Sequence, residues 1–242
     1  MRRRFIKFTD KEKCATFPDN SRNFHQILNE DPGRVTAMQK ILFCLAAIVL
    51  CISVVNAQEA PPGVRMAAEA GLPHFLSLIP TGERSSYGFT KDDVLDQAYL
   101  AEPFNLHTIA PPALLGYQPG DSVPALLSKT SLWYFPVMMR DKVRAILVVD
   151  QVDGKWQAVS LGYVPLAQQL QGVLQQWPRA KGFHPLLIAV FQAKEHLIMV
   201  PEVSSHELIS LAPLKPGLEM KSAGNILERL KPIVADNLKQ KF

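Results

Sequence analysis

The sequence has 242 residues, with a formal net charge of +4 at neutral pH, six histidines and three cysteines. Residues 58–242 carry 17 basic and 17 acidic side chains, because nine of the 26 basic residues and five of the 22 acidic ones come earlier. This neutral balance leaves no basic stripe, so no nucleic-acid partner is expected. The three cysteines, Cys14, Cys44 and Cys51, also come earlier, which excludes a thiol nucleophile or a cysteine metal cluster in the remainder.

Residues 1–37 mix charges with proline, asparagine and glycine and show no sustained apolar period. Such a composition is typical of a disordered leader. An export signal normally starts at the N-terminus. The other interpretation is therefore that Met38 is the true start and that residues 1–37 are a non-native extension. Both interpretations place residues 1–37 outside the folded domain.

An apolar run spans residues 41–55 and is shorter than the roughly 18 to 20 residues that cross a bilayer. Lys40 precedes it and Val55-Asn56-Ala57 follows, which is the positive start and small-residue exit of a signal peptide. We therefore predict a signal peptide at Met38–Ala57, cleaved before Gln58. The protein would be exported, periplasmic or secreted, and would meet the membrane only during export. A buried helix or an uncleaved anchor is the alternative.

Helical patterns come first in the predicted domain, residues 58–242. Residues 64–80 have a helical pattern that Gly71 and Pro73 are expected to break. Residues 89–103 start with Thr90 as a cap and Asp93 three residues later, close to the capping-box spacing. Residues 104–110 then alternate as a strand.

Three strands and a helix follow. Branched and aromatic residues bounded by turn residues predict strands over 133–139, 142–149 and 156–163. Their short connections predict an antiparallel meander. Residues 165–177 place apolar side chains on one helical face and glutamines on the other.

A second set of strands and a helix has a similar order. Residues 184–193 and 196–200 predict a hairpin, residues 205–213 a strand, and residues 222–240 a helix that Pro232 kinks or restarts. The chain is predicted to form one α+β domain, an antiparallel meander with helices packed on one face. Strands followed by a helix occur twice, at 133–177 and 186–240.

No motif of a serine hydrolase, zinc protease, P-loop or dinucleotide site occurs, so no catalytic residue, metal or cofactor is predicted. The histidines after residue 57 lack metal-ligand spacing, although His196 and His206 could meet if their strands pair. Asp141, Asp150 and Asp153 could bind calcium or act as acid and base, but turn chemistry explains them better.

Aromatic side chains mark one candidate ligand site, formed by Trp133, Tyr134, Phe135 and Trp156. Tryptophans on neighbouring strands can line a ligand or peptide groove. Packing in the core is the alternative for such large aromatics. Pro136 indicates an edge strand or a bulge, and an edge could accept an extended peptide.

The segment WYFPVMMRDKVRAILVVDQVDGKWQAVSLG, residues 133–162, resembles a family of uncharacterised exported bacterial proteins. Their pattern is W-x-F-P-V, then D-G-x-W, then S-[LI]-G. More distantly, a hairpin followed by a helix is similar to PepSY-like and streptopain-propeptide-like modules. That resemblance implies helices on an antiparallel sheet and the inhibition or chaperoning of secreted proteases, and it supplies no catalytic residue.

Three functions are compatible with these features. The first is an exported, non-enzymatic binding module for a protein, peptide or small ligand. The second is a PepSY-like protease inhibitor or chaperone acting in trans, which predicts an exposed sheet edge or groove near residues 133–137. The third is a hydrolase with an unrecognised Asp/His site.

Overall fold

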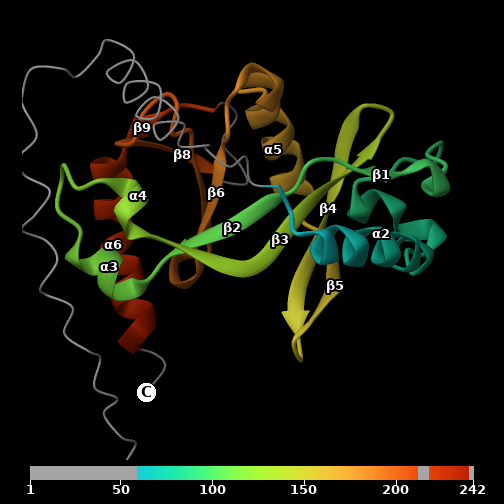
Figure 1. Cartoon of the computed structure of the whole chain (residues 1–242), viewed down its shortest axis with the longest axis horizontal. Helices are drawn as coiled ribbons and strands as arrows, with labels where there is room; N and C mark the ends of the chain where they lie inside the picture. The colour runs from blue at the N-terminus through green and yellow to red at the C-terminus, as the bar shows by residue number, and fades with distance from the viewer. Residues whose placement is uncertain (1–58, 212–217, 240–242) are drawn as a thin grey trace, which may run out of the picture. The chain divides into compact units, whose positions relative to one another are not determined.

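The computed structural model describes residues 59–211 and 218–239 (Figure 1). The predicted signal peptide, the segment before it and the three cysteines lie outside the described residues. Helices and 3₁₀ turns are α2 (Pro62–Ser77), η1 (Thr81–Tyr87), η2 (Leu95–Gln97), α3 (Pro111–Gly116), α4 (Val123–Leu126), α5 (Val164–Gln176), η3 (Arg179–Lys181), η4 (Phe191–Ala193) and α6 (Ala223–Lys239). Strands are β1 (Tyr99–Leu100), β2 (Phe104–Ile109), β3 (Leu127–Met139), β4 (Lys142–Val152), β5 (Lys155–Gly162), β6 (Leu186–Val190), β7 (Glu195–Met199), β8 (Glu207–Leu211) and β9 (Lys221–Ser222).

The strands form one sheet in the order β5-β4-β3-β2-β6-β7-β8-β9, and β1 also pairs with β3. Every neighbouring pair is antiparallel except β2 and β6, which run parallel at the centre. The predicted α+β class with a largely antiparallel sheet is therefore confirmed.

The meander of β3, β4 and β5 matches the predicted strands, and its turns explain the residues between them. Arg140, Asp141 and Asp153 all have positive φ, between 49° and 61°. Two-residue hairpins favour such left-handed turn residues because their twist matches that of the strands. Asp141 and Asp153 are therefore turn residues, which is the interpretation that the sequence favoured.

Pro136 lies in the interior of β3 rather than on an edge strand. It pairs with Ile146 on one side, and on the other its carbonyl accepts the N–H of Ala101 at 2.9 Å. Ala101 lies in the break between β1 and β2. The side of Pro136 that lacks an N–H faces this break, so no hydrogen bond to a continuous strand is lost. A register shift follows directly, between Val137 and Met138, which is the bulge that Pro136 indicated.

Helices cover both faces of the sheet, and the expectation of helices on one face is wrong. Helix α5 packs with Phe104 and Leu187 on one face. Helix α2 packs on the opposite face of β4 and β5, and α6 packs with Ile188, the neighbour of Leu187 that points the other way (Figure 1). The reason is local, since β3 and β4 carry apolar residues on both faces and each face needs cover.

Two predictions at the start of the domain are also wrong. Helix α2 continues through Gly71 and Pro73 instead of breaking there. A Cβ on Gly71 would lie 2.3 Å from the Cβ of Ala158 in β5, so this glycine permits close helix–sheet packing. The predicted helix 89–103 is replaced by a turn, η2 and β1.

At the other end of the domain, the predicted last helix is present as α6. It continues through Pro232 without a second start. Within residues 59–211 and 218–239, no helix combines the length and apolar character needed to span a bilayer.

Candidate functional site

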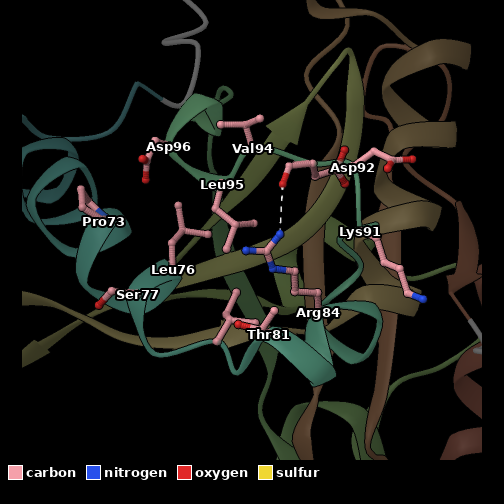
Figure 2. A pocket seen from close by; sticks show the side chains of 12 residues that line it. Pro73, Leu76, Ser77, Thr81, Arg84, Lys91, Asp92, Val94, Leu95 and Asp96 are labelled. Atoms are coloured by element: carbon pink, nitrogen blue, oxygen red, sulfur yellow. Dashed lines mark hydrogen bonds between the residues drawn. The ribbon is translucent and has the colours of Figure 1, made fainter.

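An open pocket of about 580 Å³ lies where α2 ends, and we call it the α2 pocket (Figure 2). Three consecutive parts of the chain build it: the last turn of α2 with the residues after it, η1, and the loop that leads into η2. The lining residues are Pro73, Leu76, Ser77, Ile79, Thr81, Arg84, Lys91, Asp92, Asp93, Val94, Leu95 and Asp96. Its volume falls in the range of about 300–1,000 Å³ that is usual for small-ligand sites.

Apolar and charged groups share this pocket. Leu76 and Ile79 are buried and Leu95 is half-buried, and these three contribute apolar surface. Val94 is 51 % exposed, which is high for an apolar side chain in a pocket wall. Seven of the twelve lining residues are polar or charged, so this pocket is more polar than the usual ligand site, whose walls are mainly apolar.

Arg84 is the cation at the centre of the close-up view (Figure 2). Its Nη1 donates one long hydrogen bond of 3.4 Å to the carbonyl oxygen of Asp93. Its Nε is buried and has no hydrogen-bond partner within the described part of the chain. A guanidinium has five N–H donors; the buried Nε cannot reach a ligand, so the unused donors open to one are those that remain on Nη1 and Nη2.

Asp93 forms the buried anchor of the loop that lines the pocket. Its side chain is fully buried. The backbone N–H of Thr90 donates to its Oδ2 at 2.7 Å, and Arg144 Nη2 lies 3.2 Å from the same oxygen. Arg140 approaches at 3.9 Å, and it also donates to the carbonyl oxygen of Asp92. Carboxylate and arginines together hold the loop against the β3–β4 hairpin.

The charge of Asp93 is maintained despite its burial. Burial alone would raise the pKa of this carboxyl group, because it disfavours the charged form. Hydrogen bonds from Thr90 and the positive charges of Arg144 and Arg140 outweigh that effect, so the pKa of Asp93 lies below its ordinary value. Asp93 is therefore a carboxylate at neutral pH.

Gly88 lets η1 come close enough for this arrangement. Its φ is +81°, and a Cβ there would lie 2.1 Å from the carbonyl oxygen of Arg144. Glycine alone tolerates both the left-handed backbone and the close approach. The same contact places η1, which carries Arg84, beside the strand that carries Arg144.

The four aromatic residues predicted as a ligand site do not share one surface. Trp133 and Phe135 are buried between the sheet and α2, and Trp156 is partly buried at the edge of the same cluster. Tyr134 lies on the other face with α5. Burial of Trp133 and Phe135 favours the alternative of core packing.

Tyr134 belongs to a small aromatic group on its own face of the sheet. Its ring centroid lies 6.0 Å from that of Tyr163 and 6.3 Å from that of His196. Burial, and then the neighbouring Tyr163, raise the pKa of Tyr134 to about 12. Burial lowers the pKa of His196 below its ordinary value.

The polar residues weighed as catalytic or metal-binding groups are separated by the fold. Asp141 lies at one end of β4 and Asp153 at the other. His196 pairs with Leu211, so the antiparallel register places His206 at the opposite end of β8, and the two histidines do not meet although their strands pair. Among the described residues, no group of three or more metal-ligating side chains is close enough to hold an ion.

The edge expected for a protease inhibitor is also not at residues 133–137. Strand β3 pairs with β4 on one side, and with β2 and β1 on the other. Extended peptides add to unpaired strand edges, and this segment offers none.

Sequence reasoning pointed to Asp93 only as a helix cap and did not single out Arg84. The predicted contact between Thr90 and Asp93 does form, although no helix follows it. The arginines that bind Asp93 are 47 and 51 residues away along the chain. Such a distant pairing has no signal in a single sequence.

Fold and pocket together define an α+β domain with an open pocket at the C-terminal end of α2. Comparisons of the chain with protein-family models, with curated proteins and with solved structures found no match. The resemblance to exported and PepSY-like proteins therefore stays a prediction.

Proposed function

We propose that this chain is an exported binding module whose ligand combines an apolar body with a carboxylate and occupies the α2 pocket. One observation carries the proposal: Arg84 lines the pocket with most of its donors unused. A carboxylate is the best-matched partner for a guanidinium, because two parallel N–H···O bonds can form. Leu76 and Leu95 would contact the apolar part of the ligand.

The buried carboxylate of Asp93 strengthens this proposal. Its charge is balanced by Arg140 and Arg144, so it does not need Arg84 as a counter-ion. Arg84 contacts the backbone oxygen of Asp93 and not its carboxylate. A ligand carboxylate would therefore meet an arginine that is not already paired.

Binding can be tested with octanoate and octanamide, two ligands that differ only in the charged group. We expect octanoate to shift the amide NMR signals of Leu76, Val94 and Leu95 and octanamide to shift them at higher concentration. Loss of one charge-assisted contact is worth about 1.5–3 kcal/mol, so Arg84→Gln should weaken octanoate binding at least tenfold. Lys155→Gln, a matched loss of charge at an exposed position of β5, should leave octanoate binding unchanged.

Two results would contradict the proposal. One is equal binding of octanoate and octanamide to the wild-type chain. The other is octanoate binding that survives Arg84→Gln unchanged.

Export is supported by the apolar run and its flanks, Met38–Ala57. Expression of the full-length chain in a bacterium, followed by mass spectrometry of the purified protein, tests this part separately. The expected N-terminal residue is Gln58. A chain that retains Met1 or Met38 would show that no cleavage occurs.

A further inference from the structure

The charges that line the α2 pocket are arranged at two ends. Figure 2 shows Arg84 and Asp96 on opposite sides of Leu76 and Leu95. Arg84 comes from η1 and Asp96 from η2, so two separate turns of the chain supply the opposite charges. The apolar side chains lie between them in this view.

The end that carries Asp96 favours a positive charge. Asp96 is exposed, and its carboxylate has no hydrogen bond or ion pair to any described residue. The last turn of α2 contributes Pro73, Leu76 and Ser77 to the same pocket. A helix of 16 residues carries partial negative charge at its C-terminal end, which adds to the charge of Asp96.

The opposite end keeps its positive charge for a ligand. Asp93, whose backbone carbonyl accepts the hydrogen bond from Arg84, has its carboxylate neutralised by Arg144 and Arg140. Lys91 extends away from Leu76 and Leu95 in the close-up view, so it does not compensate Asp96 (Figure 2). Lys91 and Asp92 also line the pocket without an ion pair to another residue that the structure describes, but Arg84 and Asp96 are the charges that lie on opposite sides of Leu76 and Leu95.

We infer that the ligand of the α2 pocket is zwitterionic, a short apolar peptide with both termini free. The inference rests on the proposed function. The terminal carboxylate binds Arg84, the terminal ammonium lies by Asp96 and the end of α2, and apolar side chains contact Leu76 and Leu95. A pocket of about 580 Å³ has room for more than a single amino acid.

Three forms of one peptide test this assignment: trileucine, N-acetyl-trileucine and trileucine amide. Each is titrated into the purified full-length chain and followed by the amide NMR signals of the pocket. We expect acetylation to weaken binding roughly two- to fivefold, the range for an exposed ion pair. Amidation should weaken binding at least tenfold, because Arg84 loses a charge-assisted contact.

Variants assign each effect to its residue. In Asp96→Asn, acetylation should cause no further loss, while amidation still weakens binding. Asp153→Asn removes the same charge from an exposed turn and should behave as the wild type. A purely structural role of Asp96 would weaken all three peptides equally and would not remove the effect of acetylation.

The outcomes separate the two proposals. If amidation weakens binding and acetylation does not, or if acetylation has the same effect in Asp96→Asn, the zwitterionic ligand is refuted and the carboxylate site stands. If none of the peptides binds while octanoate does, the zwitterionic ligand is refuted and the carboxylate site stands. If amidation has no effect, both are refuted together.

Discussion

Asp93→Asn tests how the α2 pocket is held in place. The substitution keeps the shape of the side chain and removes its charge. Arg144, whose side chain is only 17 % exposed, then loses its counter-ion, and Arg140, at 57 % exposed, loses a weaker one. The loop between η1 and η2 should loosen from the β3–β4 hairpin.

The size of the effect follows from the burial of the partners. Removing one member of a buried ion pair costs about 3–5 kcal/mol of unfolding free energy. The cost here should be smaller, because both arginines reach water and the asparagine oxygen still accepts a hydrogen bond from Thr90. We expect a loss of about 2–3 kcal/mol.

Urea unfolding at pH 7, followed by tryptophan fluorescence, measures this loss. With a denaturant dependence of roughly 2–3 kcal/mol per molar urea, the midpoint should fall by about 1 M. Asp92→Asn is the matched control, since its side chain is exposed and adjacent in sequence. It should change the unfolding free energy by less than about 0.5 kcal/mol.

The pH dependence provides a second measurement. The pKa of Asp93 in the folded chain lies below its ordinary value of 3.8, so the carboxylate is charged in both states above that pH and stabilises the fold fully. As the pH falls below 3.8, the unfolded chain takes up the proton first, and the stabilisation is lost through the folded pKa. The difference between wild type and Asp93→Asn should therefore shrink in acid.

Equal midpoints for Asp93→Asn and Asp92→Asn at pH 7 would refute this reasoning. So would a difference from wild type that stays constant from pH 7 to pH 2. Either result would mean that the arginine contacts contribute no net stability.

Three further predictions follow from single contacts. Gly88→Ala should lower the unfolding free energy in urea by at least about 2 kcal/mol, because the new Cβ meets the carbonyl oxygen of Arg144 at a position of positive φ. Gly120→Ala has positive φ but open space around the new Cβ, and should lose about 1 kcal/mol. Equal losses in the two variants would contradict the steric role of the Arg144 contact. Burial lowers the pKa of His196, so below pH 6.5 the unfolded chain binds the proton first and the unfolding free energy falls. His196→Gln should make this fall less steep, and an unchanged slope would exclude a contribution from His196. In ultraviolet titration Tyr134 should ionise late, with a pKa of about 12, and Tyr163→Phe should lower that pKa, whereas an unshifted titration would exclude coupling between the rings.

Local sequence patterns predicted most of the sheet and the two long C-terminal helices. Strands β3, β4 and β5 alternate or are continuously apolar between turn residues, and α5 has one apolar face, so each element carries its own signal. The predicted break at Gly71 was wrong because the glycine serves tertiary packing against Ala158. The predicted helix 89–103 was wrong because Asp93 binds arginines from the hairpin instead of only capping its own segment.

The candidate site was harder to predict than the fold for a physical reason. Its key residue, Arg84, lies in a 3₁₀ segment without periodicity, and a single half-buried arginine has no distinguishing signal in a sequence. Its importance depends on donors left unused after folding, which is a property of the packed structure. The aromatic residues that did stand out in the sequence mostly fill the core.

The two sets of strands and helix predicted from the sequence, 133–177 and 186–240, become equivalent in strand order once β2 is added to the first. From the parallel central pair, β2 leads outward through β3, β4 and β5 to α5, and β6 leads outward through β7, β8 and β9 to α6. Helices α5 and α6 cover opposite faces. A two-fold axis parallel to the strands, between β2 and β6, preserves strand direction and exchanges the faces, so it relates the two sets.

The α2 pocket lies entirely outside this symmetric arrangement. All its lining residues fall between 73 and 96, in α2, η1 and the loop to η2, which precede β2 in the chain. These segments cover one face of β4 and β5, and the symmetric sets do not include them. Binding specificity would thus reside in the segment added before the sheet, while the sheet supplies the arginines that hold it. Substitutions of Arg84 and Asp96 should therefore change ligand binding with little effect on stability, whereas substitution of Asp93 changes both.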